Sequence, residues 1–126
     1  MLSGLGVSVD IAGNAEVVTF DYEDMSNRLM NDNKLMRSIS EMFYQDMVKQ
    51  ITELKISIKE NDIDQVTAIL HQIKGSSANV GGKALSALAH EMELAVKARG
   101  IKVIQGNIEQ LEDNFNTLKA SMEQAL

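Results

Sequence analysis

Proline, cysteine and tryptophan are absent from this chain of 126 residues, and aromatic residues make up only 4% of it. Without cysteine, neither disulfide bonds nor thiolate metal sites can form, which is compatible with a reducing cytoplasm. The lack of proline and the abundance of Leu, Ile, Met, Ala, Glu, Gln and Lys favour helices over sheets. Apolar residues still account for 44% of the chain, so we expect one domain with a substantial core.

Positive charge is also scarce, with 12 basic residues against 18 acidic ones and a net charge of −6. Such a surface disfavours nucleic acid as a partner, because nucleic-acid binding relies on Lys and Arg to neutralise phosphates. No apolar run of about 18 residues occurs, so we expect no membrane-spanning segment and no membrane contact by this domain. The Gly-rich loops that cradle nucleotide phosphates are missing too, so no ATP site is predicted.

The start of the chain shows no helical periodicity. Residues 1–20 mix Gly, Ser, Ala and Val without a repeat and lack the pattern of a signal peptide, so we expect a linker or N-terminal tail. Asp21 is expected to cap a short helix. The apolar residues of that helix are Tyr22, Met25, Leu29 and Met30. Residues 21–126 then make up the predicted helical domain.

Apolar residues recur every three or four positions along four longer segments, which is the spacing of amphipathic helices. The predicted helices cover about residues 34–59, 63–80, 83–98 and 102–125. The positions expected to face the core are Leu35, Ile39, Met42, Phe43, Met47, Ile51, Leu54 and Ile58, then Val66, Leu70, Ile73 and Ser77, then Leu85, Leu88, Ala89, Met92 and Val96, and finally Val103 or Ile104, Ile108, Leu111, Phe115, Leu118 and Met122. Short connections between long helices favour an all-α, antiparallel up-and-down four-helix bundle, with the additional short N-terminal helix packed across one end.

One histidine stands out by its surroundings. At 100° per residue, His71 lies roughly 150° from the centre of the apolar stripe of its helix and therefore faces solvent. Its neighbours one turn away include the small residues Ala68 and Gly75 together with Lys74, and the small residue Ala78 follows one turn further on. A glycine inside a helix costs roughly 0.5–1 kcal/mol relative to alanine, so helix stability did not select Gly75.

Three interpretations of His71 are open: an ordinary surface histidine, a metal ligand, and a nucleophile that briefly carries a covalent group. A metal site needs further ligands on the same face, and no histidine follows at i+3 or i+4, so no metal site is predicted. A nucleophile would explain the small neighbours, because a second protein must bring its reacting atom close. It would also explain Lys74, whose ammonium group can neutralise phosphate oxygens.

The next helix presents a polar stripe away from its apolar face, composed of Ser86, His90, Glu93 and Lys97. A carboxylate on a neighbouring helix can accept a hydrogen bond from Nδ1–H of an imidazole, which fixes the tautomer and leaves Nε2 bare for attack. We predict that Glu93 has this role toward His71. The alternative is that the stripe is simply the solvated face of an ordinary helix.

The run HQIKGSSANVG at residues 71–81 closely resembles the H-x-x-K-G-[SA]-[SA]-x-x-x-G signature of histidine-containing phosphotransfer (HPt) domains, of the type found in hybrid sensor kinases. The resemblance extends over about residues 20–126, with one departure at Asn61-Asp62, where many relatives have Gly-Asp. It implies that His71 accepts a phosphoryl group from the aspartate of a receiver domain and passes it to another receiver. It also implies that Lys74 is the cation on the phosphate side and that Gly75 clears access.

The resemblance implies further roles around the histidine. The position of Glu93 hydrogen-bonds the imidazole in many relatives, and His90 and Lys97 correspond to polar or basic groups that line the site. Receiver domains dock through apolar contacts around the histidine, to which Ala68 and Ala78 can contribute. The expected partners are receiver domains. The domain is either freestanding or part of a hybrid sensor kinase, and in the second case it is the cytoplasmic end of a membrane-bound protein and has the rest of that kinase as a further partner.

No cofactor is expected in the domain itself, since the receiver is expected to supply Mg²⁺ along with its own aspartate and lysine. On its own the chain is therefore expected to be a phosphotransfer intermediate and not an enzyme. A second hypothesis is a helical interaction domain that keeps the shape and has lost the chemistry. The intact set of His71, Lys74 and Gly75 favours phosphotransfer.

Overall fold

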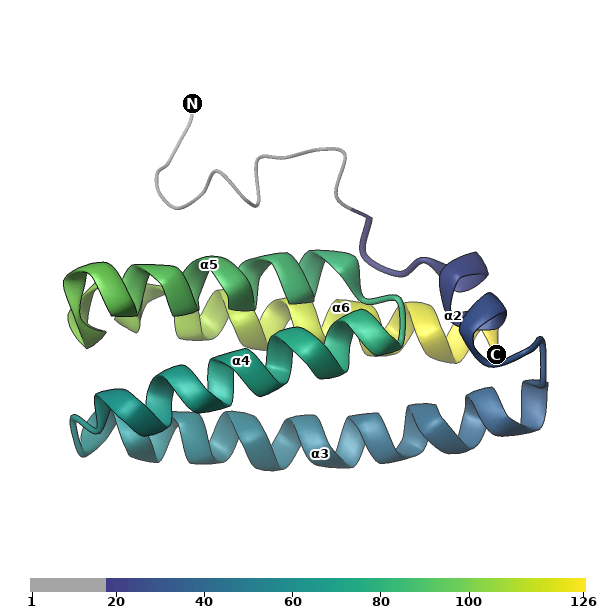
Figure 1. The fold of residues 1–126 in the computed structure, drawn as a ribbon. Coiled ribbons are helices and arrows are strands. Elements are labelled where there is room, and N and C mark those ends of the chain that lie inside the picture. The colour runs from purple at the N-terminus through teal and green to yellow at the C-terminus, as the bar shows by residue number, and fades with distance from the viewer. Residues whose placement is uncertain (1–17) are drawn as a thin grey trace.

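A computed structural model describes residues 18–126, and every regular element within them is a helix (Figure 1). In chain order the elements are α2 (Tyr22–Arg28), α3 (Asn33–Lys59), α4 (Ile63–Asn79), α5 (Lys83–Arg99), the 3-10 helix η1 (Ile101–Asn107) and α6 (Ile108–Ala125). Most of the predicted tail, namely residues 1–17, lies outside the described residues. No helix in the described part is long and apolar enough to cross a membrane.

Aspartates begin three of these helices. Asp21, Asp32 and Asp62 each accept a hydrogen bond from the backbone N–H three residues ahead, at 3.0–3.1 Å. Such a bond satisfies one of the four N–H groups that the first turn of a helix leaves free. The turns before α4 and α5 contain left-handed residues, Asn61 with φ of 56° and Gly81 with φ of 77°. These local signals reverse the chain sharply between consecutive helices.

The four long helices run antiparallel to their sequence neighbours, and α2 lies across the end of the bundle at which the C-terminus is found (Figure 1). Helices α4 and α5 pack against one another most extensively. The buried apolar side chains include Met36, Phe43, Met47, Ile51 and Leu54 from α3, Val66, Ile69, Leu70 and Ile73 from α4, Leu85, Leu88, Met92 and Val96 from α5, and Leu111, Phe115, Leu118 and Met122 from α6. This architecture confirms the predicted helical bundle with a short N-terminal helix.

Two apolar positions depart from the prediction. Leu35 and Met42 are exposed, because they lie roughly 120–140° from the centre of the buried stripe of α3. Helices α4 and α6 cover only one face of α3. The set of core-facing positions that the spacing of apolar residues predicted for α3 was therefore wider than the face that is buried. Of the alternatives at the start of the last segment, Ile104 is buried and Val103 is exposed.

The last predicted helix, 102–125, is also divided. Residues Ile101–Asn107 form the 3-10 helix η1, and the α-helix begins only at Ile108. Gly106 lies within this stretch, where a glycine weakens α-helical propensity. The tighter 3-10 turn is common at the ends of α-helices. It buries Ile101 and Ile104 against the bundle.

The segment before α2 is joined to the turn between α4 and α5. The backbone N–H of Ala84 donates to the carbonyl of Val18 at 2.9 Å, and that of Asp21 donates to the carbonyl of Gly81 at 2.8 Å. The Asp21 carboxylate also pairs with Lys83 at 3.0 Å. A Cβ at Gly81 would lie 2.5 Å from the carbonyl oxygen of Asp21, so this close approach requires glycine. Val18 therefore belongs to the folded unit, although it lies within the predicted tail.

Candidate functional site

His71 lies in the middle of α4 with its side chain 65% exposed, as its position on the helical wheel predicted. Several residues beside it have small side chains, so the surface there does not protrude. A Cβ placed on Gly75 would meet no atom within 4 Å outside its own helix backbone, so the side of the histidine facing that turn is open. Ala68 is exposed and Ala78 is half-buried. The imidazole thus projects from a flat surface that another protein can approach closely.

Glu93 lies under the imidazole and connects the two helices. Its Oε2 is 3.4 Å from Nδ1 of His71 and 3.0 Å from Nζ of Lys97, while its side chain is only 7% exposed. The expectation that Glu93 lies well off the apolar face of its helix was therefore wrong. The wheel of α5 alone does not show that α4 packs over this position and removes it from solvent.

The Glu93 carboxylate is ionised at neutral pH despite its burial. Burial acts to raise the pKa of Glu93, but the Lys97 ammonium and the His71 imidazole outweigh it and hold that pKa below its usual value of 4.5. An ionised carboxylate can only accept hydrogen bonds. It therefore favours the His71 tautomer that carries its proton on Nδ1, and the lone pair of Nε2 is then free and directed toward solvent.

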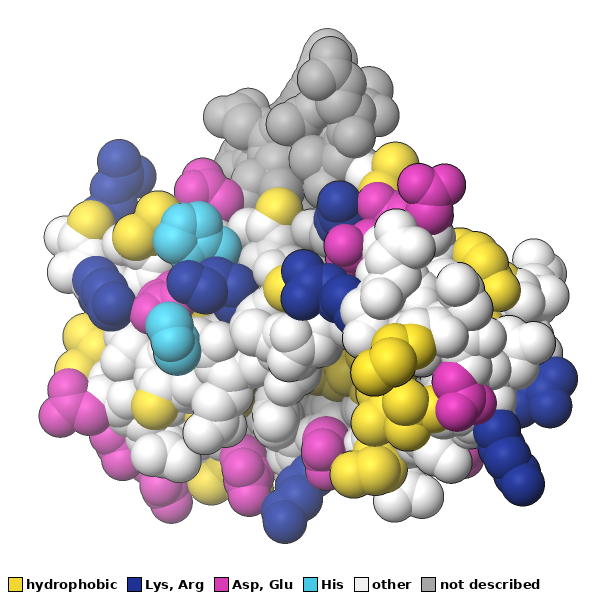
Figure 2. Space-filling view, turned by 45° about the vertical axis from the view of Figure 1, so that its right-hand side comes forward, with side chains coloured by type: hydrophobic (Ala, Val, Ile, Leu, Met, Phe, Trp, Pro, Cys, Tyr) yellow, Lys and Arg dark blue, Asp and Glu magenta, His cyan; other side chains and the backbone are white. Residues whose placement is uncertain are grey.

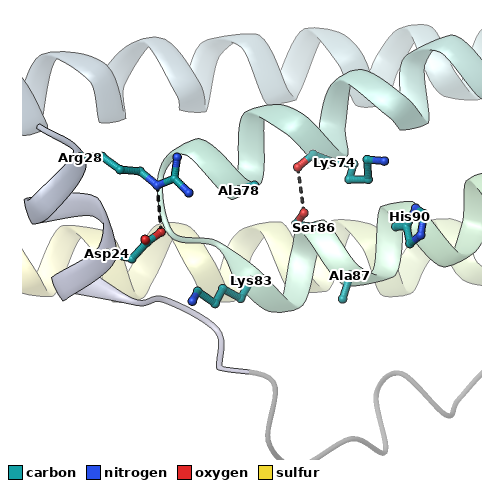
Figure 3. Close-up of a pocket in the computed structure, with 8 residues that line it drawn as sticks. All are labelled: Asp24, Arg28, Lys74, Ala78, Lys83, Ser86, Ala87 and His90. Carbon is teal, nitrogen blue, oxygen red and sulfur yellow. Dashed lines mark hydrogen bonds and ion pairs between the residues drawn. The ribbon is translucent and has the colours of Figure 1, made fainter.

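A hollow of about 340 Å³ adjoins this site between α2, α4 and α5. Figure 3 shows Lys74 and His90 at one end of it and the Asp24–Arg28 ion pair at the other. In the part of the chain that the structure describes, the Lys74 ammonium has no ion-pair partner, so its charge is available at the surface. Ser86 takes no part in chemistry here, because its hydroxyl donates to the carbonyl of Lys74 at 2.8 Å and ties α5 to α4.

The two histidines of the chain lie on one face of the molecule, with Lys or Arg side chains beside and between them (Figure 2). A chain with a net charge of −6 therefore gathers cations around this one site. Arg28 and Lys83 also border the adjoining hollow. Sequence reasoning missed both, because they come from α2 and from the first residue of α5, and no spacing along one helix relates them to His71.

The structure places His71 beside Glu93, and Glu93 beside Lys97. Lys74, Ala78 and His90 line the adjoining hollow, whereas Ala68 is exposed on α4 one turn before His71. From α4 come Ala68, His71, Lys74, Gly75 and Ala78, and from α5 come His90, Glu93 and Lys97. Within residues 18–126 no group of three or more His, Asp or Glu side chains is placed to hold a metal ion. The arrangement offers a bare imidazole nitrogen, a buried carboxylate behind it and a free ammonium one turn away.

Comparison with known proteins gives three matches. The family model described as "Hpt domain" matches residues 38–124. A curated relative, Histidine-containing phosphotransfer protein 2 of Arabidopsis thaliana, is 27% identical over 85 residues, which cover 65% of this chain and 54% of the relative. The chain therefore spans about half the length of that relative.

The third match is a solved structure, the crystal structure of the HPT domain from a sensor hybrid histidine kinase of Shewanella. It superposes with a TM-score of 0.71 at 17% sequence identity and covers 86% of this chain and 93% of that one. This likeness shows that the two chains share a fold.

Proposed function

The chain belongs to the Hpt domain family, and we propose on this premise that it is a histidine phosphotransfer module of a multistep phosphorelay. His71 accepts a phosphoryl group from the aspartate of one receiver domain and passes it to the aspartate of another. The observation that carries this proposal is the pairing of an exposed imidazole with a buried, ionised carboxylate, 3.4 Å from Nδ1 to Oε2. A surface histidine without a function has no need of such a partner.

The chemical step follows from this geometry. The lone pair on Nε2 of His71 forms the N–P bond while the P–O bond to the receiver aspartate breaks and that carboxylate leaves with the electron pair. The proton stays on Nδ1, so the ring gains positive charge as the phosphoryl group arrives. The Glu93 carboxylate faces this developing charge from behind and stabilises it. Transfer to the second receiver is the same step in reverse.

Phosphoryl transfer otherwise demands positioning and charge neutralisation more than covalent machinery. The ammonium of Lys74, one turn from His71, has no ion-pair partner within residues 18–126 and is suited to the phosphoryl oxygens. Gly75 leaves the approach to the imidazole open. Ala68 and Ala78 offer small apolar surfaces on which a receiver can dock. His90 borders the same hollow as Lys74 and adds a polar group to the docking face.

The partner supplies what this chain does not. We propose that the receiver brings Mg²⁺, the phosphorylated aspartate and its own lysine, and that the chain alone neither binds ATP nor phosphorylates itself. The module acts with receiver domains and within or beside a hybrid sensor kinase. The Shewanella structure is a domain of such a kinase. An interaction domain without chemistry is the second candidate, and the intact His71, Lys74 and Gly75 count against it.

The direct test uses a receiver domain that carries a radiolabelled phosphoaspartate. Receivers from the same genome are each incubated with this chain, and the label is followed onto it. We expect label that survives base and is lost in acid, as phosphohistidine behaves, and none on His71→Gln. That variant should fold normally, because the side chain is exposed. Absence of transfer from every receiver, with the wild-type chain folded, would support the interaction domain instead.

A further inference from the structure

One oxygen of Glu93 has two contacts and the other has none. Oε2 lies 3.0 Å from Nζ of Lys97, one turn along α5, and 3.4 Å from Nδ1 of His71 across the helix seam. Oε1 is buried and has no hydrogen-bond partner among the described residues. A carboxylate held at only one oxygen is free to rotate unless a strong contact fixes it. The charge-assisted bond to Lys97 is the stronger of the two contacts at Oε2.

We propose that Lys97 is a positioning residue for His71, which holds the Glu93 carboxylate ionised and turned toward α4 so that Nε2 of the imidazole stays bare. The proposal rests on the phosphotransfer function proposed above. Lys97 then acts through the Glu93 carboxylate, which faces Nδ1 of the ring, and not on the phosphoryl group at Nε2. The resemblance to related domains implied only that a basic group at this position lines the site.

The distances favour this role over direct contact with the phosphoryl group. The phosphoryl group forms on Nε2, and the two ring nitrogens point to different sides of the imidazole. The Lys97 ammonium is bonded to the carboxylate on the Nδ1 side, and it would have to leave that bond to reach phosphoryl oxygens. Among the described residues Lys74 has no such bond, and it is the cation proposed above for the phosphoryl oxygens on the Nε2 side.

Removal of the Lys97 charge has a definite consequence for the proton on His71. The charged or titratable groups that act on Glu93 are Lys97 from its own helix and His71 from α4. Without Lys97, a carboxyl that is only 7% exposed faces a neutral imidazole alone, and burial then favours its protonated form. A protonated carboxyl can donate to Nδ1. The ring proton then moves to Nε2 and blocks the nucleophile.

The test compares Lys97→Met, which keeps the length and loses the charge, with Lys97→Arg, which keeps the charge. Lys55→Met is the matched control, because Lys55 is an exposed lysine paired with Glu112 at 2.7 Å on the far helices α3 and α6. The tautomer of His71 is read from imidazole ¹⁵N shifts in the unphosphorylated protein. Phosphate acceptance is measured with phosphoramidate, a small donor that needs no receiver, and thermal melting confirms the fold.

We expect Lys97→Met to shift His71 from the Nδ1–H to the Nε2–H tautomer and to slow acceptance about tenfold. Lys97→Arg and Lys55→Met should behave as the wild type. An unchanged tautomer in Lys97→Met would overturn the proposal, and a slower rate in that case would place Lys97 on the phosphoryl group. If Lys97→Met shifts the tautomer but the wild-type protein never accepts phosphate, the positioning role stands and the phosphotransfer function is refuted.

Discussion

Replacing Gly75 separates access to His71 from helix stability. Gly75 lies inside α4, and a Cβ there would meet no atom within 4 Å outside its own helix backbone. The substitution Gly75→Ala should therefore realise the full difference in helix propensity, about 0.8–1 kcal/mol in the free energy of unfolding. In a domain of this size that corresponds to a rise of roughly 3–5 °C in Tm, measurable by circular dichroism.

A longer side chain at the same place should separate fold from function. Gly75→Gln is expected to keep or raise Tm, because glutamine is a good helix former and the position is open. The side chain would rise beside His71 and obstruct the receiver, so transfer should fall at least tenfold, equivalent to about 1.4 kcal/mol in the barrier. The assay is the rate of label transfer from a phosphorylated receiver.

Gly81→Ala provides the control for Gly75→Ala, since each of these two changes adds one methyl group to a glycine in or beside α4. At Gly81 φ is 77° and the new Cβ would lie 2.5 Å from the carbonyl of Asp21, so Tm should fall. Normal transfer by a folded Gly75→Gln protein would refute the access argument. A fall in Tm for Gly75→Ala would show that the position packs against another surface.

Substitutions at four further residues each address one role. Lys74→Ala should slow transfer with little change in Tm, since the Lys74 ammonium has no ion-pair partner among the described residues; an equal rate would show that the partner alone provides the cation. Glu93→Gln should retain much of the activity because its amide oxygen can still accept from Nδ1–H, whereas Glu93→Ala should lose more, and equal rates for both variants and the wild type would exclude the positioning role. Ala68→Glu should weaken receiver binding in calorimetry at constant fold, and unchanged affinity would place docking elsewhere. Ser77→Ala should raise the free energy of unfolding by about 1 kcal/mol in urea titrations, because the Ser77 hydroxyl is buried and, among the described residues, has no hydrogen-bond partner; a loss of stability would show that the hydroxyl is bonded.

The position of a helix and the place where it ends could be predicted from the sequence, because apolar residues recur at helical spacing and glycine favours particular backbone angles. The spacing of Val66, Leu70 and Ile73 placed α4 and turned His71 outward, and the structure has the helix at Ile63–Asn79 with that side chain exposed. Gly81, the last residue of the run that resembles the family signature, follows the end of this helix and has a left-handed φ, which glycine adopts readily. These signals act within one or two turns, so a single sequence contains them.

Features that depend on packing between helices were harder to predict. The burial of Glu93 and its contact with His71 arise because α4 packs against α5, which no wheel of one helix can show. The joining of Val18 to Ala84 uses backbone groups, and these leave no pattern in side chains. The exposure of Met42 follows from how little of α3 its neighbours cover.

The central claim is that Nε2 of His71 carries the phosphoryl group while Nδ1 keeps its proton toward Glu93. The most direct measurement is ¹H–¹⁵N NMR of the chain after it has been phosphorylated by a receiver, which identifies both the modified histidine and the modified nitrogen. We expect the phosphoryl group on Nε2 of His71 and an unmodified His90. Phosphorylation at Nδ1, or on His90, would contradict the geometry from which the mechanism is derived.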